Sequence, residues 1–289
     1  MTETPLSSAT SDASPRTAVD THSFDSGDGD LVYRDSGPRD GQLVVLLHTG
    51  FVDRTQYDNL VPGLAAQGYR VVVPDARGHG DSANASRPFR FTDDLAALLR
   101  HLDAVPAVLV GVSMGAMIAS DTALEHPELV RALVMSGYGL GDHDADDPWF
   151  AERAAAQNDA LWRGDIPAWL DVFLDWIPGP DRALADIDPE IPRQVREMAI
   201  RTLMKHTPDE PDHAVPVTGK EQRARELTVP VLAVNGAFDC AGVLRSVART
   251  VAAVPDARAV DLADAGHYTT MERPEEFTRI LVDFLRTLA

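Results

Sequence analysis

One pentapeptide of the chain combines a nucleophilic side chain with the glycines of a tight turn. Residues 111–115 read G-V-S-M-G, the one match to the G-x-S-x-G pattern in the sequence. This pattern presents a serine hydroxyl at a sheet edge when a strand precedes it and a helix follows. Here an apolar run at 107–110 precedes it, and 114–125 has helical composition. The sequence therefore predicts that Ser113 is a nucleophile, at a helix N-terminus whose N–H groups can bind an oxyanion.

A serine hydroxyl needs a base, and the base needs an acid that orients it. Asp239 follows an apolar run at 231–234, so we expect it at the carboxyl end of a strand, where open α/β sheets gather their sites. His267 precedes the last predicted helix, and the order Ser113, Asp239, His267 is that of a nucleophile-elbow triad. Asp264 is the alternative acid. The competing interpretations are a loop cap for Asp239 and a surface histidine for His267.

The elements that would position these residues alternate along the chain. Phe24 and residues 31–33 flank a turn-like segment, which predicts an N-terminal hairpin. Apolar, strand-sized runs occupy 43–47, 70–73, 107–110, 132–135, 231–234 and, more weakly, 258–262. Helical patterns occupy 57–66, 92–102, 114–125, 244–254 and a last segment that opens with Pro274. This alternation predicts an α/β fold, with a mostly parallel sheet covered by helices on both faces.

The alternation of strand and helix patterns stops between residues 141 and 216. This segment contains no strand-like run, and its composition indicates a helical insertion interrupted by prolines. We call residues 141–216 the cap segment. The chain has four tryptophans, and all lie in it: Trp149, Trp162, Trp169 and Trp176. The last three are spaced by seven, which is typical of one helical face, although Pro167 interrupts it. Two interpretations stay open: the rings join the segment to its neighbour, or they line an apolar pocket.

Composition excludes several classes of function. The chain has 289 residues, with 26 Lys and Arg against 45 Asp and Glu, a net charge of −19, which disfavours nucleic acid and anionic membrane surfaces as partners. Its single cysteine, Cys240, forms no internal disulfide, and no apolar run approaches the roughly 20 residues of a membrane helix. We expect residues 1–21 to be a disordered tail without a secretory signal, and the protein to be cytoplasmic.

Cofactor and metal motifs are missing from the sequence. The chain has two lysines, Lys205 and Lys220, and neither follows a phosphate-binding glycine pattern. No G-x-G-x-x-G opens a helix after a strand. His206 and His213 are separated by prolines, and no H-E-x-x-H or paired cysteines occur. The sequence therefore predicts neither a cofactor nor a metal.

Several motifs together resemble the α/β-hydrolase superfamily, and the resemblance covers nearly all of the chain after the tail. Residues 46–51, L-L-H-T-G-F, resemble the family's oxyanion loop; residues 75–82, D-A-R-G-H-G-D-S, resemble its D-x-R-G-x-G-x-S turn; and H-P-E follows at 126–128. The resemblance implies a hydrolase core at 22–140 and 217–289, with the cap segment as a helical lid. A serine at position 113 argues against the branches that use a carboxylate nucleophile.

The resemblance also implies residues for the oxyanion hole and the substrate pocket. The backbone N–H of Met114 would act together with that of Gly50 or, as second choice, Phe51. Thr49 departs from the family pattern, in which a glycine follows the histidine. His48 would be structural rather than catalytic. Phe51 and the four tryptophans are the candidate substrate contacts.

The expected activity is hydrolysis, through an acyl-enzyme, of an ester or lactone of a small to medium, largely apolar compound. The same family suggests alternatives: a carbon–carbon bond hydrolase, a perhydrolase or cofactor-free oxygenase, or an acyltransferase or cyclase of natural-product metabolism. A receptor that holds a small molecule under the lid without turnover is the non-enzymatic alternative. The expected partner is a small-molecule substrate, and the chain would be a monomer or homodimer.

Overall fold

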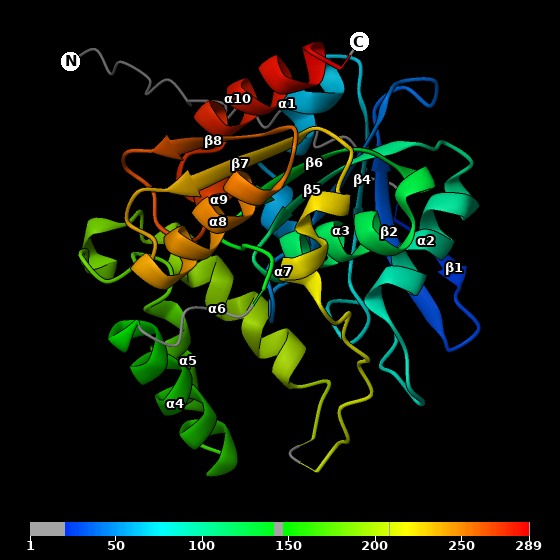
Figure 1. The fold of residues 1–289 in the computed structure, drawn as a ribbon. Helices are drawn as coiled ribbons and strands as arrows, with labels where there is room; N and C mark the ends of the chain where they lie inside the picture. Colours follow the sequence, from blue (N-terminus) through cyan, green and yellow to red (C-terminus); the bar gives the residue numbers. More distant parts are fainter. Residues whose placement is uncertain (1–20, 142–146, 208, 289) are drawn as a thin grey trace, which may run out of the picture.

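The computed structural model describes residues 21–141, 147–207 and 209–288. Within these ranges a single eight-stranded sheet has the order β1-β2-β4-β3-β5-β6-β7-β8 (Figure 1). The strands are β1 (Thr21–Asp25), β2 (Asp30–Ser36), β3 (Leu43–Leu47), β4 (Arg70–Pro74), β5 (Ala107–Val112), β6 (Val130–Ser136), β7 (Val231–Gly236) and β8 (Ala257–Leu262). Each predicted strand is found, which confirms the α/β class.

The parallel part of the sheet follows from the continuous apolar runs. Every residue of β3, β4 and β5 is buried, as in strands covered on both faces. Strands β3 to β8 pair in parallel, whereas β1 and β2 form the expected antiparallel hairpin, and β2 pairs antiparallel with β4. The edge strand β8 is the exception in burial, because its middle residues are exposed.

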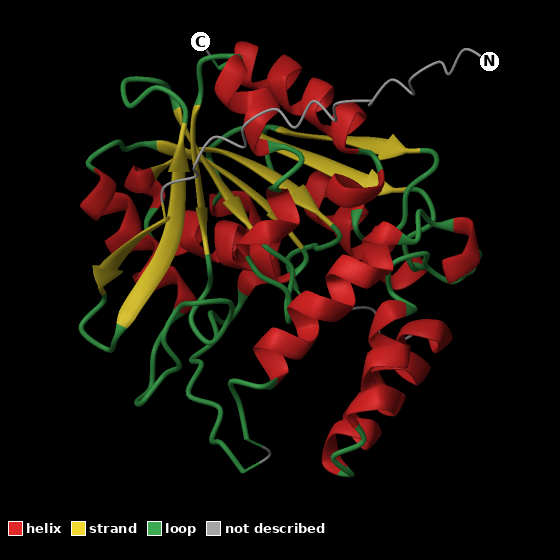
Figure 2. Ribbon diagram, turned by 180° about the vertical axis from the view of Figure 1, so that it is seen from behind, coloured by secondary structure: helices red, strands yellow, loops and turns green. Residues whose placement is uncertain are grey.

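Helices cover both faces of the sheet (Figure 2). On one face α1 (Val61–Ala66) and α10 (Pro274–Arg286) bury Leu64 and Phe277 in one core cluster, and on the other α2 (Phe91–Leu102) and α3 (Met114–Glu125) bury Leu99 and Ala119 in a second. The remaining elements outside the cap segment are η1 (Arg54–Tyr57), η2 (Pro127–Leu129), α7 (Lys220–Arg223), η4 (Ala224–Glu226), α8 (Ala241–Ala253) and α9 (Thr269–Glu272).

One expected helix is divided. Residues 57–66 were predicted as one helix, but a 3-10 turn occupies Arg54–Tyr57 and α1 begins only at Val61. Asp53 caps the short turn by accepting the N–H of Thr55, and proline stands in the first turn of α1. Since proline has no N–H to donate to the preceding turn, the helix starts there instead of continuing from Tyr57.

The described part of the cap segment is helical and stands outside the sheet, where α4 (Pro148–Trp162), α5 (Ile166–Leu174) and α6 (Glu190–Leu203) lie together (Figure 1). The short η3 (Leu184–Asp186) lies between α5 and α6. Apolar side chains of these helices form a core cluster with Val52, Tyr268 and Met271. The boundaries at 141 and 216 stay a prediction.

The predicted tail lies almost entirely outside the described residues. Its last residue, Thr21, does not belong to it, because Thr21 pairs with Arg34 as the first residue of β1. Among the described helices, none is both long and apolar enough to cross a membrane.

Candidate active site

Ser113 occupies a strained turn between β5 and α3. Its φ of 53° and ψ of −116° lie where side-chain-bearing residues are rare. The two flanking glycines permit the turn: a Cβ on Gly111 would lie 2.2 Å from the carbonyl carbon of Gly115, and one on Gly115 would lie 1.9 Å from the oxygen of Leu47. The N–H of Ser113 donates to the oxygen of Ser136 at 2.8 Å. The strand–turn–helix context predicted for Ser113 is therefore present.

Asp239 and His267 form a buried hydrogen-bonded pair. Asp239 follows β7 and His267 follows β8, so the two parallel strands bring them to the same edge of the sheet. His267 Nδ1 and Asp239 Oδ2 are 2.8 Å apart, and the side chains are 7% and 2% exposed. The other oxygen of Asp239 accepts the N–H of Cys240 at 2.8 Å. With Nδ1–H donated to the carboxylate, the neutral ring keeps its lone pair on Nε2.

A glycine after β6 connects this pair to the serine turn. Gly137 directly follows Ser136, whose carbonyl accepts the N–H of Ser113. A Cβ on Gly137 would lie 2.7 Å from Cε1 of His267 and 3.4 Å from Oδ2 of Asp239, and the φ of Gly137 is +62°. The imidazole therefore packs against the strand end that also holds the serine turn. All three predicted triad residues lie around this one point of the sheet edge.

Two opposing effects act on the pKa of His267. Burial disfavours the charged imidazolium, and the charge and hydrogen bond of Asp239, helped by the charge of Glu272, outweigh it, so the pKa of His267 is raised. The alternative acid takes no part in this pair. The side chain of Asp264 is 71% exposed and lies 3.8 Å from Arg273.

The loop after β3 meets the start of α3, as the oxyanion hole requires. A Cβ on Gly50 would lie 3.7 Å from Cβ of Met114, and the N–H of Thr49 donates to Oε1 of Gln56 at 2.9 Å. Phe51 has a φ of 63°. Gly50 and Met114 are therefore neighbours, and the side-chain amide of Gln56 fixes the residue that replaces the expected glycine.

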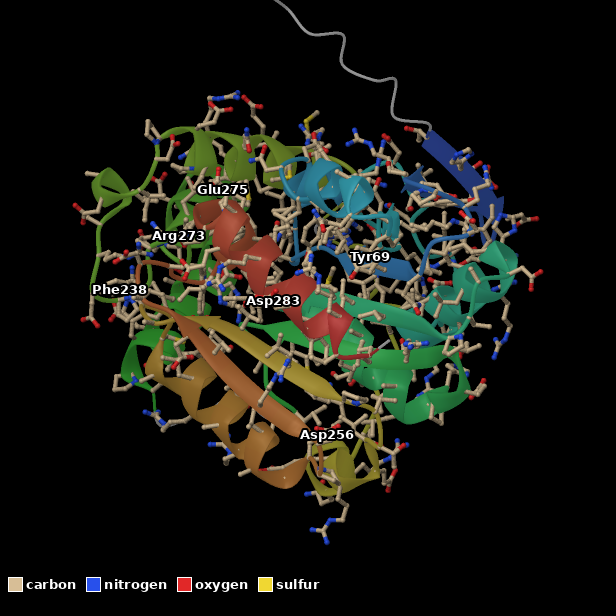
Figure 3. The ribbon with its side chains drawn as sticks, turned by 90° about the horizontal axis from the view of Figure 1, so that it is seen from above. Tyr69, Phe238, Asp256, Arg273, Glu275 and Asp283 are labelled. Carbon is tan, nitrogen blue, oxygen red and sulfur yellow. The ribbon has the colours of Figure 1, made fainter. Side chains whose placement is uncertain are left out.

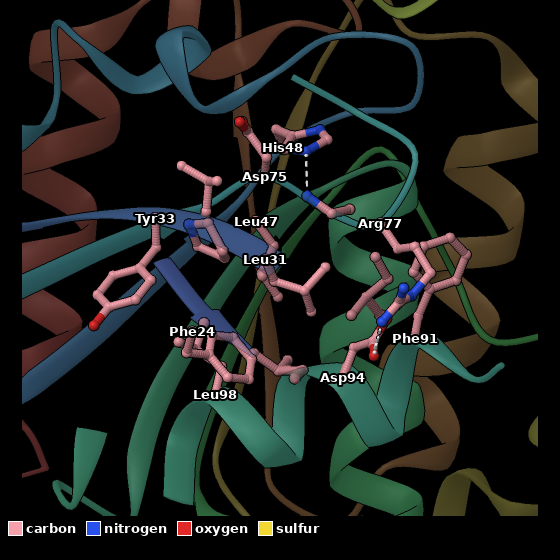
Figure 4. A pocket seen from close by; sticks show the side chains of 15 residues that line it. Phe24, Leu31, Tyr33, Leu47, His48, Asp75, Arg77, Phe91, Asp94 and Leu98 are labelled. Carbon is pink, nitrogen blue, oxygen red and sulfur yellow. Dashed lines mark hydrogen bonds and ion pairs between the residues drawn. The ribbon is translucent and has the colours of Figure 1, made fainter. Parts of the chain in front are cut away.

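His48 holds this loop from behind. Its Nε2 accepts the N–H of Ala76 at 2.9 Å, and its Nδ1 lies 2.8 Å from the oxygen of Thr49. Burial lowers the pKa of His48, so the ring is neutral. Beside it lies a cavity of about 30 Å³, lined largely by apolar side chains such as Leu47 and Phe91 (Figure 4). This volume is far below the roughly 300 Å³ of the smallest usual ligand pockets, so His48 faces the core.

The D-x-R-G-x-G-x-S turn stabilises itself through its own side chains. Asp75 accepts the backbone N–H groups of Arg54 and Asp81, both at 2.8 Å. The guanidinium of Arg77 binds the carboxylate of Asp94 at 2.7 Å, as Figure 4 shows. This turn supports the oxyanion loop and contributes no side chain to the triad.

Aromatic side chains of the cap segment lie in two groups. In the first, the ring centroid of Phe51 is 4.6 Å from that of Trp169 and 5.8 Å from that of Phe173. In the second, the centroids of Trp149 and Trp176 are 4.9 Å apart, and Trp176 lies 6.1 Å from the ring of His267. The first group thus adjoins the predicted oxyanion loop, and the second adjoins the predicted base.

Trp162 belongs to neither group. It is the last residue of α4 and is 89% exposed; the chain turns at Gly164, whose φ is +67°, and α5 begins only at Ile166, so the helical face does not continue. Its inclusion among the substrate contacts was therefore wrong. Trp169, at 1% exposure, serves as packing between cap and core. The packing interpretation thus applies to Trp169, and pocket lining by Trp149 and Trp176 stays a prediction.

Two residues near the site were not singled out from the sequence. Glu272 lies on α9, with its side chain 4% exposed, and accepts the N–H of Gly266, the residue before His267, at 2.8 Å. Arg182 of the cap segment pairs with Glu272 at 2.7 Å. An acid five residues after the predicted base, inside a short helix, was the available signal for Glu272. Arg182 lies 90 positions away in the sequence and gave none. Among the described residues, no three His, Cys, Asp or Glu side chains gather as metal ligands.

The comparison with protein families agrees with this geometry. The sequence model of the alpha/beta hydrolase fold matches residues 42–274, which is most of the chain. The chain therefore belongs to the α/β-hydrolase fold family, a family of hydrolytic enzymes.

Three relatives illustrate the range of that family. BpoC of Mycobacterium tuberculosis H37Rv, named a non-heme bromoperoxidase, is 29% identical over 263 residues, 89% of this chain and 98% of BpoC. Its crystal structure has a TM-score of 0.72 at 28% identity and covers 90% of this chain and 96% of its own. The 2-hydroxy-6-oxononadienedioate/2-hydroxy-6-oxononatrienedioate hydrolase of Cupriavidus pinatubonensis is 29% identical, over 89% of this chain and 92% of its own. The pimeloyl-[acyl-carrier protein] methyl ester esterase of Neisseria meningitidis is 27% identical, over 87% and 96%.

Proposed function

We propose that this protein is a serine hydrolase that cleaves an ester or lactone of a small to medium, largely apolar compound. Ser113 is the nucleophile, His267 the base and Asp239 the acid. The observation that carries the proposal is the buried 2.8 Å contact between His267 and Asp239, packed on the strand end that holds the serine turn. A relative named as a methyl ester esterase supports the ester class.

The reaction has two halves. His267 Nε2 takes the proton of Ser113 as its Oγ attacks the carbonyl carbon, and Asp239 stabilises the imidazolium that forms. The N–H groups of Met114 and Gly50 bind the oxyanion. The imidazolium then protonates the leaving alcohol as the carbon–oxygen bond breaks. Water, deprotonated by His267, attacks the acyl-enzyme, and the acid product leaves as Ser113 regains its proton.

The oxyanion loop and the cap segment supply the proposed substrate contacts. Phe51 ends the oxyanion loop and Trp176 stands beside His267, so an acyl chain bound over Ser113 would lie between two aromatic groups. Aromatic rings contribute large apolar contact areas. This arrangement favours an uncharged, apolar acyl group.

The test is Ser113→Ala, assayed with p-nitrophenyl esters. We expect kcat to fall by about a millionfold, the scale on which loss of a triad serine acts. The matched control is Ser120→Ala in α3, the helix that follows Ser113; the Ser120 hydroxyl donates to the oxygen of Met117 at 3.1 Å. A fluorophosphonate probe should add its mass to the parent and the control but not to Ser113→Ala. Equal activity of the parent and Ser113→Ala would refute the proposal.

A second candidate function is hydrolysis of a carbon–carbon bond in a vinylogous diketone. It is supported by the relative from Cupriavidus pinatubonensis, whose name states such a dienedioate substrate. Fluorophosphonate labelling of Ser113, without turnover of any p-nitrophenyl ester from acetate to decanoate, would favour this candidate. Turnover of those esters would favour the first.

A further inference from the structure

Arg182 of the cap segment contacts the loops behind the predicted triad at several points. Its Nη2 lies 2.7 Å from Oε2 of Glu272, its Nε donates to the oxygen of Pro178 at 3.1 Å, and its Nη1 donates to the oxygen of Asp264 at 3.4 Å. Its guanidinium carbon stands 4.6 Å from the ring centroid of Phe238. Only 14% of the side chain is exposed, and these four neighbours hold the planar guanidinium in one orientation.

These contacts reach the neighbours of both the predicted acid and the predicted base. Phe238, under the guanidinium, directly precedes Asp239. Glu272, which the guanidinium binds, accepts the N–H of Gly266, and Gly266 directly precedes His267. One arginine of the cap segment is thus joined to the acid loop at Phe238, and to the base loop both through the carboxylate of Glu272 and directly at the oxygen of Asp264.

The backbone around Arg182 packs against the same two loops. A Cβ on Gly179 would lie 1.8 Å from the oxygen of Phe238, and a Cβ on Gly266 would lie 2.3 Å from the oxygen of Ile177. In both cases the nearest atom is a backbone oxygen, so neither glycine has room for a side chain. Figure 3 shows Phe238 and Arg273 on the same side of the molecule. The segment 177–182 therefore acts as a support placed behind the acid–base pair.

We propose that Arg182 is a positioning residue for the reaction: it holds the loops of Asp239 and His267 in register with each other and couples them to the cap segment. This inference rests on the proposed serine-hydrolase function. Arg182 acts mainly through its ion pair with Glu272, because this pair is buried and links the cap segment to the residue before the base.

The ion pair of Arg182 and Glu272 also acts on the pKa of His267. The titratable side chains around His267 are Asp239 from the loop after β7, Glu272 from α9 and the adjacent Tyr268, whose ring centroid is 6.0 Å away. Burial raises the pKa of Glu272, and Arg182 opposes that rise, which favours the charged carboxylate. The Glu272 charge then adds to that of Asp239 in raising the pKa of His267.

The first experiment replaces Arg182 by methionine, which keeps the length of the side chain without its charge. We expect kcat for p-nitrophenyl butanoate to fall about ten- to a hundredfold with a smaller change in KM, because a misplacement of about 1 Å can cost a hundredfold in rate. Arg182→Lys should recover part of the loss. An unchanged kcat in Arg182→Met would overturn the proposal.

The matched control is Arg70→Met, which removes another buried arginine–carboxylate pair. Arg70 and Asp35 are 2.7 Å apart with side chains 6% and 8% exposed, and they join β4 to β2 far from the triad loops. Arg70→Met should lower the melting temperature and leave kcat of the folded protein unchanged. If Arg70→Met lowered kcat as much as Arg182→Met, the effect of Arg182 would be general stability and the proposal would fail.

The second experiment is the pH profile of Glu272→Gln, a variant whose side-chain oxygen can still accept the N–H of Gly266. Only the neutral imidazole takes the serine proton, so kcat/KM rises with pH as His267 loses its proton. Loss of the Glu272 charge lowers the pKa of His267, and the acid limb should move to lower pH. An acid limb at the same pH as in the parent would contradict the assigned role of Glu272.

The two proposals fail in different ways. If Ser113→Ala is inactive and Arg182→Met has the kcat of the parent, only the positioning role is overturned. If Ser113→Ala keeps the activity of the parent, the serine-hydrolase proposal is overturned, and the positioning role with it.

Discussion

The core and the cap segment hold their site residues in different ways. In the core, the backbone leaves no room for an added side chain: a Cβ on Gly115 would strike the oxygen of Leu47, and one on Gly137 would strike the imidazole of His267. In the cap segment, apart from the close backbone packing of residues 177–182, side chains make the attachment. Arg201 binds Asp53 at 2.6 Å, and Lys205 Nζ donates to the oxygens of three residues of the D-x-R-G turn.

This difference separates two tasks. Backbone contacts without a side chain between them leave no freedom, which suits a nucleophile and a base that must meet within hydrogen-bond distance. Side-chain contacts tolerate substitution, so the cap segment is the part in which the substrate preference of the proposed enzyme can change while the proposed triad stays in place. Substitutions at the tightly packed core positions should therefore abolish the reaction, and most substitutions in the cap segment should change which substrates are preferred.

The largest expected effect is that of Gly115→Ala. The added Cβ would lie 1.9 Å from a carbonyl oxygen of β3, and neither backbone can move without displacing the serine turn or the sheet. We expect a loss of about 3 kcal/mol in the free energy of unfolding, at the upper end for overpacking, together with loss of esterase activity. Urea unfolding monitored by circular dichroism and a p-nitrophenyl butanoate assay measure the two losses.

A glycine of an exposed helix provides the control. A Cβ on Gly63 in α1 would meet only a methyl group of Thr278, at 3.4 Å. Gly63→Ala should stabilise the protein by up to about 1 kcal/mol, because alanine loses less backbone entropy in a helix. If Gly115→Ala were as stable and active as Gly63→Ala, the contrast drawn for the core would be wrong.

An intermediate effect is expected for Trp176→Ala in the cap segment. Trp176 lies 6.1 Å from the His267 ring and packs on Trp149, and its Nε1–H donates to Gln157 at 3.3 Å. We expect kcat/KM for p-nitrophenyl hexanoate to fall about tenfold relative to the acetate, the scale of lost apolar contacts in a pocket. Trp162→Ala, at the 89% exposed position, should leave this ratio unchanged. Equal ratios in the two variants would remove Trp176 from the substrate contacts.

The same division decides what the sequence could predict. The serine turn, the strands and the order of the triad residues depend on local patterns: glycines flanking Ser113, and apolar runs that end within two residues of the observed strand ends. A spacing of seven, by contrast, placed Trp162 with Trp169, and the turn at Gly164 between α4 and α5 separates the two. The first pattern is tied to the residues that form the turn and the strands, whereas the second assumes one continuous helix, which ends at Trp162.

Glu272 and Arg182 show the limit more sharply. Each is one charged residue in a chain with 45 acidic and 26 basic residues, so residue type does not distinguish them, and only Glu272 stands at a short spacing from His267. Their pairing depends on the path of the cap segment over the loop before α9. That path is set by apolar contacts of the cap helices with Tyr268 and Met271, residues far from the cap in sequence. Tertiary contacts of this kind leave no local pattern.

The smallest expected effect is that of Lys205→Met, which removes one side-chain attachment of the cap segment. Lys205 follows α6, and its ammonium lies 2.9 Å from the oxygen of Gly80. Since Lys205 is only partly buried, water replaces the ammonium at the freed carbonyls, and the loss should be about 1 kcal/mol, or a fall of roughly 2–4 °C in melting temperature. We also expect KM for a long-chain ester to rise while kcat for the acetate stays unchanged, because the proposed triad does not depend on this contact.

Arg196→Met, which removes an exposed ion pair between α6 and α5, is the matched control and should change neither KM for the long-chain ester nor kcat for the acetate. A fall in acetate kcat for Lys205→Met would mean that the cap segment holds the triad through more than Arg182, and the separation of the two tasks would have to be redrawn.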